Sequence, residues 1–156
     1  MIPLWYISWQ RDFFYICPMS RIMAIDYGTK RVGVAVTDPL KIVANGLDTV
    51  SNDEIMAFLE QYLAEESVET IVVGEPMHLD GRPAQIAVEV NDFVQRLKKK
   101  FPGVKIDRFD ERFTSQDAKQ IILRSGAKQK KRRDKSLIDK VSAVLILQGY
   151  MEENCY

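Results

Sequence analysis

Between residues 22 and 50 the apolar positions follow the two-residue period of β-strands. Ile22–Asp26 and Val32–Thr37 are short runs of apolar, small and β-branched residues, joined by a turn built on Tyr27–Lys30. Ile42–Val50 has the same character. The pattern therefore predicts three consecutive strands that form an antiparallel meander.

Strand and helix patterns alternate after the meander. Asn52–Glu66 has the 3.6-residue period of a surface helix, with Ser51 or Asn52 as its N-cap. The short apolar runs Glu69–Gly74 and Val104–Phe109 are typical of covered strands. The other predicted elements are, in chain order, a loop at His78–Pro83, a helix at Ala84–Phe101, a helix from Thr114 or Ser115 through Leu123, a basic loop at Ser125–Lys135 and a helix at Ser136–Glu152.

This order of elements predicts an α/β fold. The expected sheet is five-stranded and mixed, with the three-strand meander on one side, two parallel strands on the other, and helices flanking it. Active sites of such sheets lie at the carboxyl ends of the strands.

Composition limits the classes of protein that fit. The 156 residues are 46% apolar and 28% charged, which suits one globular domain, and the formal net charge is zero. Any affinity for nucleic acid must therefore come from local patches. Cys17, Cys155 and His78 do not make a disulfide framework or a zinc site. No apolar run reaches the roughly 18 residues of a membrane span, so a cytoplasmic protein without membrane contact is expected.

The first eighteen residues differ from the rest. Met1–Pro18 holds both tryptophans and six of the fifteen aromatic residues, with no clean period and no basic start of a secretory signal. Met19 directly precedes the first strand pattern. We expect an N-terminal extension at 1–18 that is not part of the fold, and a single domain at 19–156. The alternative is an apolar arm that packs on the domain or on a partner.

One acid stands in the first hairpin. Asp26 closes an apolar strand, and alternation places it on the same face as Ile22 and Ala24, at the lip of a buried sheet. A carboxylate there needs a cation, a hydrogen-bond donor or a ligand to offset desolvation. The alternative is that Asp26 only starts the turn, since Asp favours turns generally.

Further acids fall where the same site is expected. Glu75 ends the fourth strand, Asp110 and Glu111 end the fifth, and Asp139 lies in the first turn of the last helix. Helical spacing puts Asp139 on one face with the apolar Ala143 and Ile146. A lone acid there usually compensates the helix dipole. Several acids that converge by fold geometry favour a common site.

The motifs AIDYGTKRVGVAVTD, VVGEP followed by Asp80-Gly81, FDERFTS and IDKVSAVLIL together resemble the YqgF/RuvX family. These are Holliday-junction-resolvase-like proteins of the RNase H superfamily. The resemblance covers about residues 20 to 150. It implies an RNase H-like fold and a bacterial cytoplasmic nuclease that matures the pre-16S ribosomal RNA end, or that resolves branched DNA.

The resemblance also implies roles for particular acids. The family's catalytic acids carry over to Asp26, Asp110, Glu111 and Asp139. Many members have leucine where this chain has Glu75, so Glu75 is a supplementary ligand, a replacement or a bystander. The resemblance implies Asp26, Glu111 and Asp139 as ligands of Mg²⁺ or Mn²⁺, and Glu75 is a further candidate ligand from its place in the sequence.

Phosphodiester cleavage explains why acids are needed. Hard cations held by carboxylates stabilise the charge that builds up at phosphorus, and one of two ions roughly 4 Å apart can activate the attacking water. We expect Asp26 to bridge the ions, because the end of a central strand is reachable from both sides. Whether the site holds one or two ions stays open.

A basic segment predicts contact with nucleic acid. Six of the eight residues from 128 to 135 are cations, directly before the helix with Asp139, namely Lys128, Lys130, Lys131, Arg132, Arg133 and Lys135. Such a loop would neutralise phosphates, although many charge runs are simply solvated. Lys30, Arg31 and Arg112 lie near the acids in sequence, where each could touch a phosphate or pair with an acid. Nothing in these residues distinguishes RNA from DNA.

Two other functions fit parts of the sequence. The segment IDYGTKRVGVAV also resembles the phosphate loop of actin-like ATPases, which need two such domains, whereas 156 residues hold one. The second is a non-catalytic nucleic-acid-binding protein of transcription or ribosome assembly. A cleavage assay separates these from a nuclease. The oligomeric state, monomer or homodimer, is left open.

Overall fold

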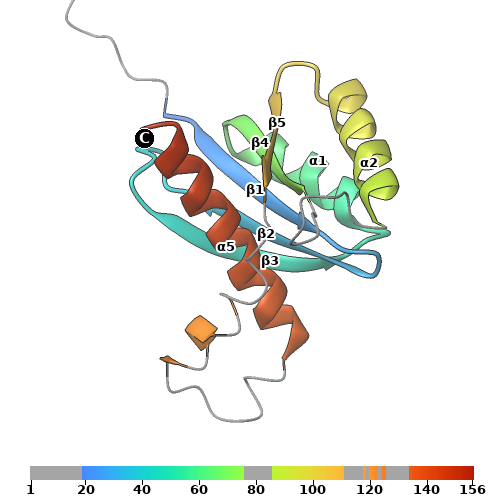
Figure 1. Cartoon of the computed structure of the whole chain (residues 1–156). Coiled ribbons are helices and arrows are strands. Elements are labelled where there is room, and N and C mark those ends of the chain that lie inside the picture. The colour runs from blue at the N-terminus through green and yellow to red at the C-terminus, as the bar shows by residue number, and fades with distance from the viewer. Residues whose placement is uncertain (1–18, 76–85, 111–117, 119, 123, 126–133) are drawn as a thin grey trace, which may run out of the picture.

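The fold is built on a five-stranded mixed sheet with strand order β3-β2-β1-β4-β5 (Figure 1). The computed structural model describes residues 19–75, 86–110, 118, 120–122, 124–125 and 134–156. The strands are β1 (Arg21–Tyr27), β2 (Arg31–Thr37), β3 (Ala44–Ser51), β4 (Val68–Glu75) and β5 (Lys105–Asp110). Strands β1, β2 and β3 pair antiparallel, and β4 is parallel to both β1 and β5. The predicted meander and parallel pair are thus confirmed.

Helices cover both faces of the sheet. Helices α1 (Ile55–Glu65) and α2 (Ala87–Lys100) lie on one face, and α5 (Lys135–Glu153) crosses the other (Figure 1). Residues 118, 120–122 and 124 are helical; all but residue 124, one position past the expected end, fall in the helix predicted from Thr114 or Ser115 through Leu123. The rest of that helix, the expected loop at His78–Pro83 and the extension at 1–18 lie outside the described residues.

Alternation along the strands divides the core into two layers. Met23 and Ile25 pack with Phe93 and Leu97 of α2, while Ile22 and Ala24 pack under α5. All of these side chains are fully buried. The face on which a strand residue projects therefore decides which helices it can meet.

Helix α1 begins later than its sequence suggested. Neither Ser51 nor Asn52 is its N-cap: the N-cap is Glu54, whose side chain makes no capping hydrogen bond. Ser51 remains in β3, and the Asn52 side chain donates to the Gly28 carbonyl at 2.7 Å. The Asn52 amide is therefore used to hold the β1–β2 turn.

Helix α5 lies very close to β2 because Gly33 has no side chain. A Cβ built at Gly33 would lie 2.1 Å from the carbonyl oxygen of Asp139. A glycine inside a strand often marks such a close approach of another backbone. Gly33 thus fixes where α5 crosses the sheet.

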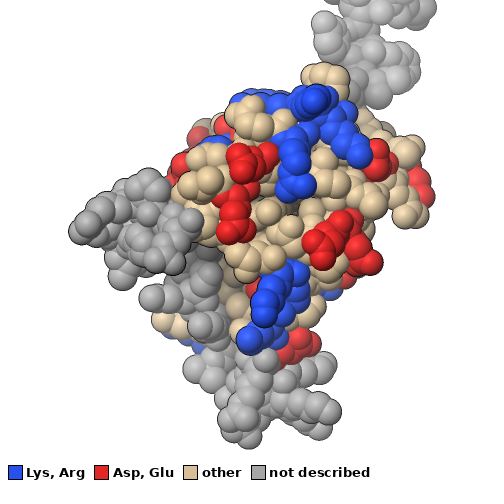
Figure 2. Space-filling model, turned by 90° about the vertical axis from the view of Figure 1, so that its right-hand side faces the viewer, with Lys and Arg blue, Asp and Glu red and all other residues tan. Residues whose placement is uncertain are grey.

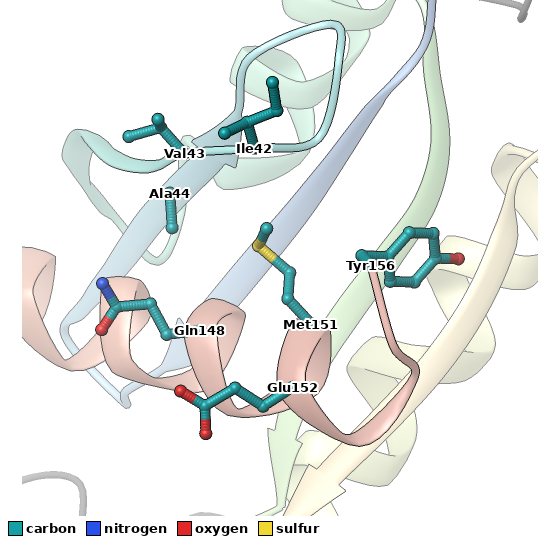
Figure 3. Close-up of a pocket in the computed structure, with 7 residues that line it drawn as sticks. All are labelled: Ile42, Val43, Ala44, Gln148, Met151, Glu152 and Tyr156. Carbon is teal, nitrogen blue, oxygen red and sulfur yellow. The ribbon is translucent and has the colours of Figure 1, made fainter.

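A hollow of about 410 Å³ lies at the far end of α5 (Figure 3). Its walls come from the segment before and at the start of β3 and from the C-terminal part of the helix: Ile42, Val43, Ala44, Gln148, Met151, Glu152 and Tyr156. Ala44 pairs with Thr37, at the opposite end of β2 from the turn beside Asp26. The hollow is therefore remote from the acids.

Charge is mixed on the described surface. Figure 2, viewed from the side of the molecule that carries α2, shows acidic groups next to the basic ones. Five ion pairs in the described ranges join different elements or loops, such as Lys100 with Glu60 at 2.6 Å. Within these ranges, no helix is long and apolar enough to cross a membrane.

Candidate active site

Asp26 and Asp139 come together at the end of β1, on the α5 side of the sheet. Asp26 pairs in register with Gly33, and the backbone of Asp139 rests on Gly33. The two carboxyl groups are close enough for the negative charge of Asp139 to raise the pKa of Asp26, in addition to the larger effect of burial. Two of the acids singled out in the sequence thus meet, one from the first strand and one from the last helix.

The pKa of Asp26 is raised to about 7, first by burial and second by the negative charge of Asp139. No cation among the described residues pairs with the Asp26 carboxylate. An acid that only started a turn would not have its pKa raised in this way. A partly buried carboxyl group beside a second carboxylate is a favourable place for a hard divalent cation.

Arg31 forms an ion pair with the neighbouring acid, Asp139. Its Nε donates to Oδ2 of Asp139 at 2.9 Å, and the two side chains are 40% and 24% exposed. Arg31 therefore pairs with an acid here, which was one of the two roles considered for it. Lys30, in the turn before it, is exposed.

The position of Asp139 in α5 excludes a simple role at the helix N-terminus. The helix begins at Lys135, one residue earlier than expected, and Asp134 is its N-cap, with a side chain that accepts from the Ser136 N–H at 3.0 Å. Asp139 is consequently the fifth residue and lies beyond the first turn. Lys135, expected in the loop, is the exposed first residue of this helix.

Glu75 projects to the other face of the sheet. It follows Ile71 and Val73 in the alternation of β4, and these two pack in the layer under α1 and α2. Its carboxylate accepts from Arg108 Nη1 at 3.3 Å. Of the three roles considered for Glu75, this position favours the bystander.

Asp110 is on the same side as Glu75. The two residues are paired in register at the ends of β5 and β4, and Phe109, one residue earlier, packs under α5. Asp110 is exposed and takes part in an interaction of its own. The structure thus brings Asp26 and Asp139 together but does not add Asp110 to them.

Several expected site residues lie outside the described part of the chain: Glu111, Arg112, Lys128, Lys130, Lys131, Arg132 and Arg133. Within the described part, no three His, Cys, Asp or Glu side chains gather closely enough to hold a metal ion. The third expected ligand, Glu111, directly follows the last residue of β5.

The family model described as "RuvX: Holliday junction resolvase" matches residues 20–153. The chain belongs to the RuvX family. A relative from Christiangramia forsetii, named "Putative pre-16S rRNA nuclease", is 51% identical over 135 residues, which are 86% of this chain and all of the relative. A protein of the same name from Flavobacterium psychrophilum is 45% identical over 133 residues, 85% of this chain and 97% of the relative.

Solved structures support the fold of this RuvX chain. T. thermophilus RuvC, in complex with a Holliday junction substrate, has a TM-score of 0.55 at 18% identity, covering 86% of this chain and 96% of RuvC. Fowlpox virus resolvase, in complex with Holliday junction DNA, has a TM-score of 0.55 at 13% identity, covering 87% of this chain and 99% of the resolvase. The expected RNase H-like architecture is confirmed.

Sequence reasoning missed two residues that build this RuvX site. The run Val32–Thr37 predicts only a strand, whereas Gly33 within it is the kind of residue that signals a close backbone approach. Asn52 was considered as a helix cap, whereas it ties down the turn after Asp26. The Asx preference for turns was the available signal for its role.

The pKa of Asp26 gives a pH prediction. If Asp26 is a metal ligand, a divalent cation would compete with the proton on this carboxyl group, so metal affinity is expected to rise as pH increases from about 6 to 8 and to level off above the pKa of about 7. Titration of Mn²⁺ by calorimetry at several pH values measures this. A pH-independent affinity would show that Asp26 is not a ligand.

The same shift predicts the opposite trend for stability without metal. Because the folded-state pKa lies above the ordinary value of 3.8, the contribution of Asp26 to stability is full below that value. It is lost as pH rises through about 7. Urea unfolding in EDTA, at pH values between these two pKa values and above the higher one, measures this loss of stability.

Proposed function

We propose that this RuvX protein is a metal-dependent nuclease that processes the end of pre-16S ribosomal RNA. The observation that carries the proposal is the partly buried Asp26, whose pKa is raised by burial and by Asp139 and which has no cationic partner among the described residues. The names of the relatives from C. forsetii and F. psychrophilum support the substrate. Processing of ribosomal RNA would place the protein in the cytoplasm.

The residues present fit a divalent cation such as Mg²⁺ or Mn²⁺. Asp26 and Asp139 supply carboxylate oxygens, which such ions prefer, and Glu111 is our choice for the third ligand because Asp110 projects to the other face. A bound ion would lower the pKa of an attacking water and offset charge on the phosphate. Asp26 and Asp139 would hold the ion at the end of β1, and the α5 backbone on Gly33 would keep Asp139 in place.

The test is a cleavage assay on two substrates. Structured RNA that carries a pre-16S end and a four-way DNA junction are incubated with Mg²⁺, Mn²⁺ or EDTA. We expect cleavage of the RNA with either metal and no cleavage in EDTA. Preferential cleavage of the junction would instead assign branched DNA as the substrate, and full activity in EDTA would reject the proposal.

Binding of the substrate is assigned to the basic segment before α5. If Lys131, Arg132 and Arg133 contact phosphates, changing all three to Ala should weaken binding of every sequence. The slope of log K against log salt should become shallower by up to about 0.7 to 0.9 per lost contact. Filter binding at several salt concentrations measures the slope.

A matched control removes three cations elsewhere. Lys98, Lys99 and Lys100 form the last turn of α2 and changing them to Ala alters net charge equally. They lie on the other face of the sheet from Asp26 and Asp139, so a much smaller change in slope is expected. Equal slopes for the parent and the loop variant would show that the basic segment is only solvated.

A further inference from the structure

Arg31 is the only described cation that reaches the pair of acids with a hydrogen bond. It is the first residue of β2, where it pairs with Ser51 of β3, and alternation places it with Gly33 on the α5 side. Its Nε donates to Asp139 Oδ2 at 2.9 Å. The backbone brings the two side chains together, because α5 packs against β2 at Gly33, two residues after Arg31.

The ion pair leaves the charge of the site unbalanced. Arg31 neutralises Asp139, whereas Asp26 has no cationic partner in the described part of the chain. A divalent cation that binds both carboxylates would lie beside the Arg31 guanidinium, and like charges at such a short distance repel. Arg31 and the ion therefore favour different arrangements of Asp139.

The Arg31 guanidinium also carries N–H groups that take no part in the contact with Asp139. Arginine carries five N–H groups, and among the described residues only Nε has a hydrogen-bond partner. The side chain is 40% exposed, so it can turn away from Asp139 without passing through the core. Its planar fork suits two oxygens of a phosphate.

We propose that Arg31 and a divalent cation compete for the Asp139 carboxylate, and that the displaced guanidinium then binds a phosphate of the nucleic acid. This inference rests on the proposed function and adds a form of regulation at the same site. Ion binding and substrate binding are coupled through one side chain, since the ion frees the group that holds the phosphate.

The experiment titrates Mn²⁺ into the parent and three variants by calorimetry, without nucleic acid. Arg31→Gln removes the competing charge, so its affinity for Mn²⁺ is expected to rise by up to about fivefold, the equivalent of an exposed ion pair. Arg31→Lys keeps the charge and should bind Mn²⁺ about as the parent does. Lys30→Gln is the matched control, because it removes one exposed charge from the adjacent position that has no ion pair with a described acid.

A second measurement follows binding of non-cleaved RNA with and without Mn²⁺. In the parent, Mn²⁺ is expected to strengthen RNA binding, and in Arg31→Gln this gain should fall at least several-fold. Arg31→Lys should recover part of it, since a lysine offers a point charge but no fork.

The outcomes separate this inference from the proposed function. Weaker or unchanged Mn²⁺ affinity in Arg31→Gln would overturn the competition and leave Arg31 as a residue that merely orients Asp139. A rise as large in Lys30→Gln would also overturn it, because the effect would then be general electrostatics. If the parent binds Mn²⁺ but cleaves no nucleic acid, the proposed function fails while the Mn²⁺ comparison still decides the competition.

Discussion

Replacing Asp26 by Asn is expected to abolish metal-dependent cleavage without destabilising the metal-free protein. Asn keeps the shape of the side chain but removes the charge that would hold the ion, and losing that ion should lower the rate on the order of a thousandfold or more. The pKa of Asp26 is raised to about 7, first by burial and second by the negative charge of Asp139. At pH 8 in EDTA the variant should therefore be as stable as the parent or more stable, by up to about 1–2 kcal/mol.

Thermal melts with and without Mn²⁺ complete this test. Mn²⁺ that binds the native state is expected to raise the melting temperature of the parent, and the Asp26→Asn variant should lose most of that response. Glu89→Gln is the control, since it removes an exposed acid from α2, on the other face of the sheet. Equal metal responses in the parent and in Asp26→Asn would reject Asp26 as a ligand.

Replacing Gly33 by Ala is expected to have the largest effect on folding. The new Cβ would lie 2.1 Å from the carbonyl oxygen of Asp139, and both groups belong to backbones that cannot rotate aside. Helix α5 must then lift from β2, which should lower the free energy of unfolding by roughly 3 kcal/mol. Asp139 would move with the helix, so cleavage should fall in the fraction that remains folded.

Urea unfolding and the cleavage assay measure the two effects of Gly33→Ala. Gly103→Ala is the matched control, because a Cβ at Gly103 meets no atom within 4 Å. This variant should change stability by less than about 0.5 kcal/mol. A Gly33→Ala protein as stable as Gly103→Ala would show that α5 does not rest on this strand.

Local sequence patterns were sufficient to predict the sheet, but not to predict the face and contacts of every side chain. β-Branched runs and the order of strands and helices gave the meander and the parallel pair, because the central strands β1, β2 and β4 are largely buried and apolar. Asp26 and Asp139 could be brought together from sequence, since one ends a central strand and the other shares a helix face with buried residues. Both conclusions depend on periodicity and on the order of the elements along the chain.

Other features depend on contacts that periodicity does not contain. Glu75 follows a continuous apolar run, and a strand buried on both faces has no alternation to show which face its last residue takes. The contact of Arg31 with Asp139 spans 108 positions of the chain. Ser51 and Asn52 are good capping residues by type, but pairing with Arg31 and the bond to Gly28 use them elsewhere.

The placement of Asp139 on the last helix has a consequence for biosynthesis. During translation β1 and β2 emerge before α5, which covers Ile22, Ala24 and Val72. A nascent or truncated polypeptide that lacks α5 has the strand with Asp26 but neither the cover of that sheet face nor the second acid. Cleaving activity would therefore be withheld until synthesis of the helix is finished, so that an incomplete polypeptide still attached to a ribosome could not cut the RNA around it.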